Sequence, residues 1–168
     1  AIVVGAGLAG CFTAHALALR GFHVTVLDEH DALAMGASNN PQTVLYPNVS
    51  AYCAPLTTWM LHAFLFATRT YTPWLEAGLI QGELDGILQL NVNAKAQALH
   101  ASLQPWLDNY PELGVLVGAS EASGLAGVGV NTGALFVPGA GWLDSRGLCE
   151  FLMQTPGITW QPNTLVDD

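Results

Sequence analysis

The sequence has few charged residues, and cations are the scarcest of them. Only 10% of the 168 residues are charged, whereas a typical globular chain has about 25%. The formal net charge is −9, and the Lys and Arg residues are Arg20, Arg69, Lys95 and Arg146. A protein that holds a nucleic-acid backbone needs clustered Lys and Arg side chains. We therefore expect no nucleic-acid binding by this chain alone.

The sequence also lacks a hydrophobic run long enough to cross a membrane, although 51% of its residues are hydrophobic. No charged residue occurs between Asp31 and Arg69, or between Glu121 and Asp144. Glycine, asparagine and proline interrupt the first stretch and leave about 14 helix-compatible residues, and the second is rich in glycine, whereas a spanning helix needs about 20. We expect no membrane association.

Both ends of the chain interrupt expected structure. The chain opens with "AIVVGAG", inside an expected strand and without a methionine, and it ends with "TLVDD" after another apolar segment. A strand at the start is not a signal peptide. We expect an incomplete chain whose apolar surface partly faces a missing half; the alternative is an unusually apolar but complete domain.

Cysteine and histidine do not have the spacing of metal ligands. The cysteines, Cys11, Cys53 and Cys149, are odd in number and far apart, so we interpret them as free core thiols in a reducing, cytoplasmic compartment. The histidines form no i, i+4 pair and join no cysteine cluster, which favours structural or surface roles and no metal. They are His15, His23, His30, His62 and His100.

The first 31 residues predict a βαβ unit. An apolar run at 1–4 is followed by glycines, by an amphipathic helix from about Leu8 to Arg20, and by Gly21 as a C-terminal cap. A second apolar run at 22–27 predicts the next strand.

The rest of the chain predicts strands and helices in a less regular order. Apolar spacing predicts a helix from Pro55 to about Ala77, closed by Gly78 and kinked by Pro73. A helix at 94–104 is expected to end at Pro105, which starts a short second one through Tyr110. Other expected elements are strands at 86–93, 114–118, 133–138 and 157–162, a helical turn at 120–125, and a helix that Asp144 or Ser145 caps and that runs through Met153.

This order predicts an α/β fold of two parts. Residues 1–47 form a Rossmann-like dinucleotide-binding βαβ unit with its following loop, and residues 144–168 return to that domain. Residues 48–143 form part of an inserted α+β substrate domain, because their elements do not continue the alternation of a simple Rossmann fold.

The segment "GAGLAG" places glycines in the G-x-G-x-x-G register between a strand and a helix. Gly5 permits a tight turn, Gly7 lets the backbone approach a pyrophosphate, and Gly10 lets helix and strand pack closely. The phosphates then bind at the helix N-terminus. The alternative is a glycine-rich turn of no function.

Asp28 strengthens the dinucleotide interpretation. It follows Gly10 by eighteen positions, at the end of the second strand, where a carboxylate accepts hydrogen bonds from the ribose hydroxyls. It also repels a 2′-phosphate, which disfavours NADP.

The loop "GASNNPQTVLYP", from Gly36 to Pro47, favours a flavin over NAD. An NAD domain usually continues from its second strand into another crossover helix. Here an uncharged polar loop offers the Ala37 and Ser38 backbone and the Asn40 and Gln42 amides to a pyrophosphate, a ribityl chain and a ring edge. The alternative is an ordinary polar connection.

Several segments in the same order resemble one family over nearly the whole chain. The segments "GAGLAG…VTVLDE", "GASNNPQTVLYP", "GILQL", "GALFVPGAGWL" and "GITWQPNTLV" are similar to FAD-dependent oxidoreductases of the D-amino-acid oxidase and glycine oxidase type. More narrowly, they resemble the flavin domain of the bifunctional bacterial enzymes that complete the 5-methylaminomethyl-2-thiouridine modification of the tRNA wobble base. This resemblance implies an FAD-binding domain of the glutathione-reductase/D-amino-acid oxidase type.

The resemblance also implies site residues. The glycine turn would hold the pyrophosphate, Asp28 the ribose, Val166 the adenine through its backbone, and Ser38 and Gln42 the flavin side, with Glu29 and Ala37 as further cofactor-binding residues. The turn consists of Gly5, Ala6, Gly7, Leu8, Ala9 and Gly10. Pro41 stands where the family pattern has arginine, and Asn39 and Thr43 stand where it has glycine.

The implied reaction is the oxidation of a carbon–nitrogen bond. In the tRNA enzymes this oxidation removes a carboxymethyl group from 5-carboxymethylaminomethyluridine, and a methyltransferase domain of the same polypeptide then acts on the product. A fragment of this length is expected to be inactive alone.

Tyr46 and Trp142 are candidates for the substrate side, with ordinary packed aromatics as the alternative. Arg69 and Arg146 are more typical of solvated positions, and no catalytic base is assigned.

Two rival functions stay open from the sequence. One is a free-standing oxidase of glycine, sarcosine or a D-amino acid. The other is a dinucleotide-binding domain without catalysis, which the changed loop residues Pro41 and Thr43 permit.

Overall fold

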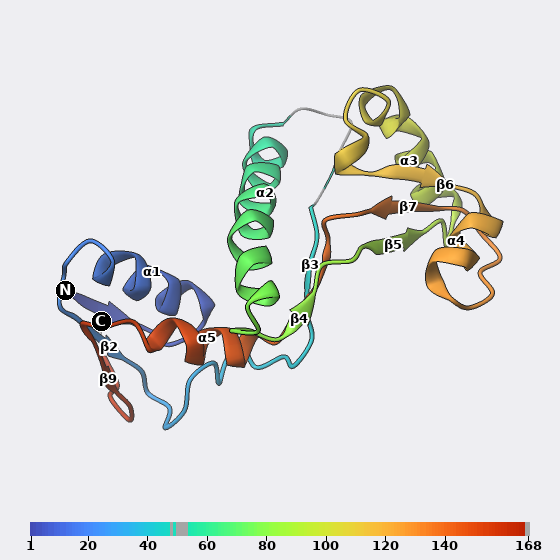
Figure 1. The fold of residues 1–168 in the computed structure, drawn as a ribbon. Helices are drawn as coiled ribbons and strands as arrows, with labels where there is room; N and C mark the ends of the chain where they lie inside the picture. Colours follow the sequence, from blue (N-terminus) through green and yellow to red (C-terminus); the bar gives the residue numbers. More distant parts are fainter. Residues whose placement is uncertain (48, 50–53, 167–168) are drawn as a thin grey trace. The chain divides into compact units, whose positions relative to one another are not determined.

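The computed structural model describes residues 1–47, 49 and 54–166 and divides into two compact units (Figure 1). Unit 1 consists of Ala1–Thr43, Trp74–Gly82 and Trp142–Asp168, and unit 2 consists of Val44–Pro73 and Glu83–Gly141. The segment Trp74–Gly82, which the sequence placed in the insertion, belongs to unit 1. The functional boundaries expected at 47/48 and 143/144 stay a prediction.

Unit 1 is built on a parallel sheet in the order β1-β2-β9. Helices α1 and α5 pack against each other, and α1 also contacts each of the strands (Figure 1). The core is apolar and contains Ala6, Ala14, Val24 and Val26, with Trp160 and Met153 packed on it. The elements are β1 (Ile2–Val4), α1 (Leu8–Ala18), β2 (Val24–Leu27), α5 (Ser145–Met153) and β9 (Ile158–Gln161).

The local signals in unit 1 are confirmed. Gly21 takes the left-handed φ of 86° just after α1, a conformation that glycine adopts without the Cβ penalty. Asp144 is the N-cap of α5, where its side chain accepts a hydrogen bond from the backbone N–H of Arg146. The βαβ unit expected from residues 1–31 is therefore present.

Unit 2 contains an antiparallel sheet in the order β5-β7-β6. Its main core joins Leu103 and Leu107 of α3 to Leu135 and Val137 of β7 and to Phe64 of α2. The elements are α2 (Pro55–Glu76), which ends in unit 1, β5 (Ile87–Leu90), α3 (Ala94–Leu107), the 3₁₀ turn Pro111–Leu113, β6 (Val115–Val117), α4 (Ala119–Ala126) and β7 (Ala134–Val137).

A third sheet, in the order β3-β8-β4, was not expected from the sequence. Its strands are β3 (Thr43–Leu45), β4 (Gly82–Glu83) and β8 (Gly141–Leu143). Strands of two or three residues are too short to show an alternating pattern. They form because distant segments pair, a long-range effect that a local pattern does not contain.

Helix α3 corrects one prediction. The sequence predicted a break at Pro105, but α3 runs from Ala94 to Leu107 without interruption. Proline removes one helical hydrogen bond, yet Leu103 and Leu107, on either side of it, are both buried in the core of unit 2. The packing of these two leucines outweighs the local preference.

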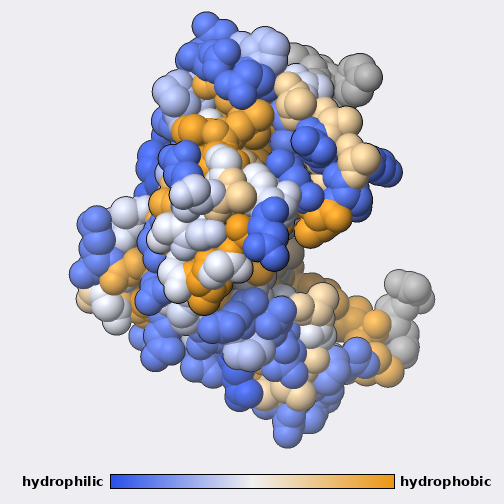
Figure 2. Space-filling view, turned by 90° about the vertical axis from the view of Figure 1, so that its right-hand side faces the viewer, coloured by the Kyte–Doolittle hydropathy of each residue, from blue (hydrophilic) through white to orange (hydrophobic). Residues whose placement is uncertain are grey.

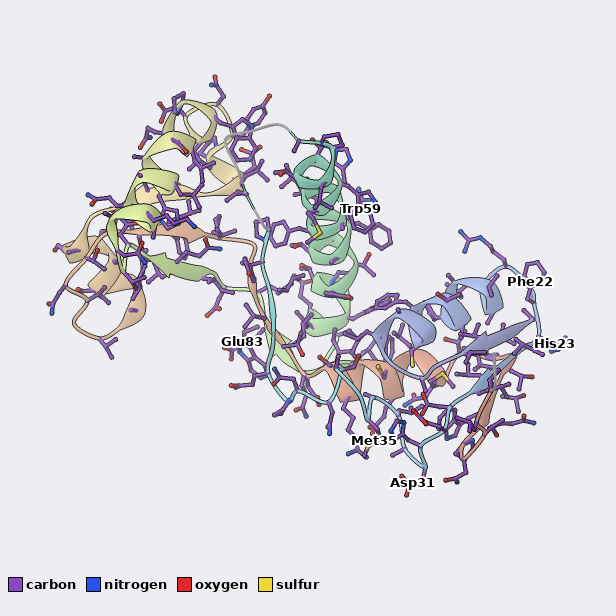
Figure 3. The ribbon with its side chains drawn as sticks, turned by 180° about the vertical axis from the view of Figure 1, so that it is seen from behind. Phe22, His23, Asp31, Met35, Trp59 and Glu83 are labelled. Carbon is purple, nitrogen blue, oxygen red and sulfur yellow. The ribbon has the colours of Figure 1, made fainter. Side chains whose placement is uncertain are left out.

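The surface carries apolar side chains among polar ones (Figure 2). Trp59 is one of the exposed large side chains and projects outward from α2 (Figure 3). Within the described residues, no helix has the length and apolar content to cross a bilayer.

Candidate functional site

The glycine turn between β1 and α1 has the geometry that its motif predicts. Gly5 has a φ of 96°, and its N–H donates to the carbonyl of Leu27 at 2.8 Å. A Cβ on Gly10 would overlap the carbonyl oxygen of Gly5 and lie 2.9 Å from its carbonyl carbon. The close approach of α1 to β1 therefore requires glycine at position 10.

Asp28 is fixed at the carboxyl end of β2 and reaches back to the glycine turn. Its Oδ2 accepts a hydrogen bond from the N–H of Ala6 at 2.6 Å, and its Oδ1 accepts one from the N–H of His30 at 2.9 Å. The His30 ring nitrogen Nδ1 lies 2.8 Å from the same Oδ1. Burial opposes ionisation of Asp28, but these hydrogen bonds outweigh it and lower the pKa of the carboxyl. Asp28 is therefore an oriented anion at neutral pH.

The N-terminus of α1 obtains a hydrogen-bond acceptor from the loop that follows β2. Its N-cap is Gly7, which has no side chain to cap the helix. The Oγ of Ser38 accepts a hydrogen bond from the N–H of Leu8 at 3.1 Å, and a Cβ on Gly7 would lie 3.2 Å from that oxygen. Amide groups at a helix start favour acceptors and anions. The loop and the glycine turn thus form one site.

A hollow of about 170 Å³ lies beside the turn. It is lined by residues from the ends of β1 and β2 and from the segment after β9, which are Val4, Gly5, Asp28, Glu29, Thr164, Leu165 and Val166. The N–H of Thr164 donates to the carbonyl of Asp28 at 2.8 Å, which holds the segment after β9 against the end of β2. A Cβ on Gly5 would meet no heavy atom within 4 Å, so the space above this turn is open.

A second and larger hollow, of about 620 Å³, lies in unit 1 beside the loop at Gly36–Pro47. Asn39, Asn40, Pro41 and Gln42 line it from the loop, and Gln81, Trp142, Asp144 and Arg146 complete it. The Thr43 and Ser145 hydroxyls are hydrogen bonded to each other, which ties the end of the loop to the start of α5.

The two aromatic candidates lie in different units. Trp142 lines the larger hollow in unit 1, whereas Tyr46 belongs to unit 2 and is 49% exposed. Their common role at a substrate side stays a prediction. Arg69, the other arginine considered from the sequence, is exposed on α2.

Cys11 and Cys149 are buried thiols, as expected for core cysteines, and Cys53 lies outside the described residues. A hydrogen bond between the two thiols lowers the pKa of Cys11 and, together with burial, raises the pKa of Cys149. In the described part of the chain, no group of His, Cys, Asp and Glu side chains has the arrangement of a metal site.

A protein-family model matches most of this chain. The family model described as "DAO: FAD dependent oxidoreductase" matches residues 1–156. The chain belongs to the DAO family of FAD-dependent oxidoreductases. Because this family is FAD-dependent, FAD is the dinucleotide whose fit to the glycine turn has to be examined.

Solved structures share the fold of this chain. Glycine oxidase from Bacillus cereus aligns with a TM-score of 0.76 at 20% identity, over 99% of this chain and 48% of that one. L-Proline dehydrogenase from P. horikoshii aligns with a TM-score of 0.76 at 18% identity, over 99% and 44% of the two chains. At these identities the likeness concerns the fold alone.

Sequence relatives are closer and much longer. The tRNA 5-methylaminomethyl-2-thiouridine biosynthesis bifunctional protein MnmC of Legionella pneumophila (strain Philadelphia 1) is 44% identical over 159 residues, which cover 95% of this chain. The protein of the same name from Pseudomonas fluorescens (strain Pf0-1) is 39% identical over 171 residues, which cover 97%. The chain spans 24% of the length of each relative.

The DAO-family residues present here fit an adenine dinucleotide. The open space above Gly5, the amides at the start of α1 and the oriented carboxylate of Asp28 suit a sugar and a pyrophosphate.

The sequence did not reveal His30, which orients Asp28, or the position of Arg146 in the larger hollow. A His two residues after an Asp is a weak signal, and no local pattern connects Arg146 with a loop a hundred residues earlier.

Proposed function

We propose that this chain binds FAD and forms the cofactor portion of an enzyme that oxidises a carbon–nitrogen bond. The observation that carries the proposal is the joint geometry of the glycine turn, Asp28 and Ser38, in a DAO-family chain. One helix start, one oriented carboxylate and one loop hydroxyl suit the phosphate and ribose of a single dinucleotide.

The proposed assignment follows the cofactor from adenine to flavin. The backbone of Val166 holds the adenine, Asp28 and Glu29 hold the ribose, and the amides of Gly5–Gly10 hold the pyrophosphate. Val166, Asp28 and Glu29 line the smaller hollow together, which supports an adenosine site there. Ala37, Ser38 and Gln42 lie on the loop toward the larger hollow and take the flavin side.

We assign the substrate from the relatives. The named biosynthesis of 5-methylaminomethyl-2-thiouridine supports removal of the carboxymethyl group from 5-carboxymethylaminomethyl(-2-thio)uridine at the tRNA wobble position. Bound FAD would supply the hydride acceptor for oxidation of the carbon beside the secondary amine, and the resulting imine of the substrate would hydrolyse to glyoxylate and the aminomethyl base. The residues of this chain bind the cofactor and orient it.

The partners follow from the same proposal. With a net charge of −9, the chain needs tRNA contacts from other parts of the polypeptide. We place it in a cytoplasmic protein that also contains a methyltransferase domain, which acts on the aminomethyl base after the oxidation.

The test uses the full-length parent protein. Purified protein is expected to show the visible spectrum of bound flavin, and incubation with undermodified tRNA is expected to remove the carboxymethyl group, as mass analysis of the nucleosides measures. Glycine or sarcosine turnover with an unchanged base would instead identify a small-amine oxidase. Protein without flavin, or one that binds NAD in its place, would contradict the proposal.

A further inference from the structure

The larger hollow of unit 1 combines side chains that neither the glycine turn nor the ribose site uses. Its volume of about 620 Å³ lies within the range of about 300–1,000 Å³ of small-molecule sites. Apart from Gln42, which the proposed cofactor assignment uses, its lining includes three carboxamides, one indole and one guanidinium: Asn39, Asn40, Gln81, Trp142 and Arg146. A gap left by imperfect packing is lined by apolar groups, whereas this lining is rich in groups that can hydrogen bond to a ligand.

The charges in the hollow leave one cation available. The carboxylate of Asp144 caps α5, since its Oδ1 accepts from the N–H of Arg146 at 3.1 Å, and the positive end of the helix dipole offsets its charge. The guanidinium of Arg146 pairs with Glu150 at 3.2 Å, but the two side chains are 50% and 54% exposed. Such a solvated pair is weak, so Arg146 can exchange Glu150 for the anion of a ligand.

The carboxamides and the indole suit a pyrimidine ring. The imide edge of uracil presents an N–H donor between two carbonyl acceptors, and each carboxamide offers both a donor and an acceptor. Trp142 offers an aromatic face of the kind on which unpaired bases stack. A guanidinium fork matches a carboxylate, whereas the nearby carboxylates of Asp144 and Glu150 disfavour a doubly charged phosphate.

We propose that this hollow binds a uracil base that carries a carboxylate, with Trp142 against the ring and Arg146 on the carboxylate. The inference rests on the proposed function, because it makes the carboxymethylaminomethyl group of the wobble uridine the ligand. Arg146 is a residue that selects the substrate, and it also supplies a positive charge beside Pro41, where the family pattern has arginine.

The experiment measures binding to the flavin-loaded full-length protein by calorimetry. The probes are the nucleosides 5-carboxymethylaminomethyluridine and 5-aminomethyluridine, together with uridine 5′-monophosphate. We expect Arg146→Gln to raise the Kd of the carboxylated nucleoside roughly tenfold or more, with the Kd of the aminomethyl nucleoside unchanged. Arg146→Lys should give an intermediate value, and Trp142→Leu should weaken both nucleosides.

Arg20→Gln is the matched control, because it removes the same charge from an exposed arginine at the end of α1. It should change none of the Kd values. In turnover with undermodified tRNA, Arg146→Gln should raise KM more than it lowers kcat.

Three results would overturn the inference. One is an unchanged Kd of the carboxylated nucleoside in Arg146→Gln. Another is uridine 5′-monophosphate binding as tightly and with the same dependence on Arg146, which would make phosphate the ligand. The third is loss of bound FAD in Arg146→Gln, which would place the flavin ring in the hollow. Failure of the proposed function is distinguishable, because the wild-type protein would then lack flavin or leave the tRNA base unchanged.

Discussion

The amide nitrogen of Ala6 and the Oδ2 of Asp28 lie 2.6 Å apart. This hydrogen bond joins the glycine turn after β1 to the end of β2, so the carboxylate proposed to hold the ribose also holds the turn proposed to hold the pyrophosphate. A substitution at position 28 should therefore weaken the binding of both the ribose and the pyrophosphate of the cofactor.

Asp28→Asn is expected to weaken FAD binding by roughly 10- to 100-fold, because hydrogen bonds to a charged group contribute about 1.5–3 kcal/mol. The amide keeps the size of the side chain but removes its charge. Fluorescence titration of the full-length protein with FAD measures the Kd. Asp31→Asn, on the same loop and exposed (Figure 3), is the control, and equal Kd values for the two variants would contradict the role of Asp28.

Gly10→Ala is expected to lower the free energy of unfolding by roughly 1–3 kcal/mol, the usual cost of overpacking. Its Cβ would overlap the carbonyl of Gly5, and neither backbone segment can move without separating α1 from β1. Urea unfolding of the wild type and the variant gives the difference. Gly36→Ala is the control, since a Cβ there meets no heavy atom within 4 Å; an equal loss in both variants would show that the close approach at position 10 is unimportant.

Ser38→Ala is expected to destabilise the cofactor-free protein by about 1 kcal/mol, the typical cost of removing an N-cap acceptor. The N–H of Leu8 then loses its partner at the start of α1. Ser102→Ala serves as the control, because that hydroxyl only donates within α3. Thermal unfolding without FAD distinguishes them, and identical melting temperatures would contradict the capping role.

Stability is expected to fall as the pH decreases from 7.5 to 5.5. Burial lowers the pKa of both His15 and His100, whereas an unfolded histidine titrates near pH 6.5. Below that pH the unfolded chain binds protons that the folded chain does not, so stability is present above about pH 6.5 and is lost below it. Urea midpoints at the two pH values measure the loss.

The double variant His15→Gln, His100→Gln should flatten this dependence, while His23→Gln, at an exposed position, should leave it unchanged. A slope that survives the double variant would assign the effect to other groups.

The sequence predicted the parts of the fold that depend on neighbouring residues. The glycine spacing of the turn, the position of Asp28, the cap at Asp144 and helices α1, α2 and α5 correspond to local signals, and the structure confirms them. The structure departs from the prediction where segments that are far apart in the chain meet. Strands β3, β4 and β8 form through the pairing of segments that are far apart in the chain, and α3 passes Pro105 because Leu103 and Leu107 are buried.

The candidate site divides in the same way. The glycine turn and Asp28 belong to one βαβ unit, and its pattern was sufficient to place them together. The hydroxyl of Ser38 at Leu8 comes from a loop thirty residues away, and Arg146 reaches its hollow from α5. Only the folded arrangement brings these groups together, so spacing along the chain could not pair them.

The position of β1 has a consequence for handling the protein. This strand stands at one end of the sheet β1-β2-β9, and its Ile2 and Val4 side chains are 70% and 62% exposed. An apolar strand at a sheet edge is a template for pairing with another chain. These 168 residues, prepared alone, would therefore self-associate as their concentration rises, so light scattering should precede any measurement on them.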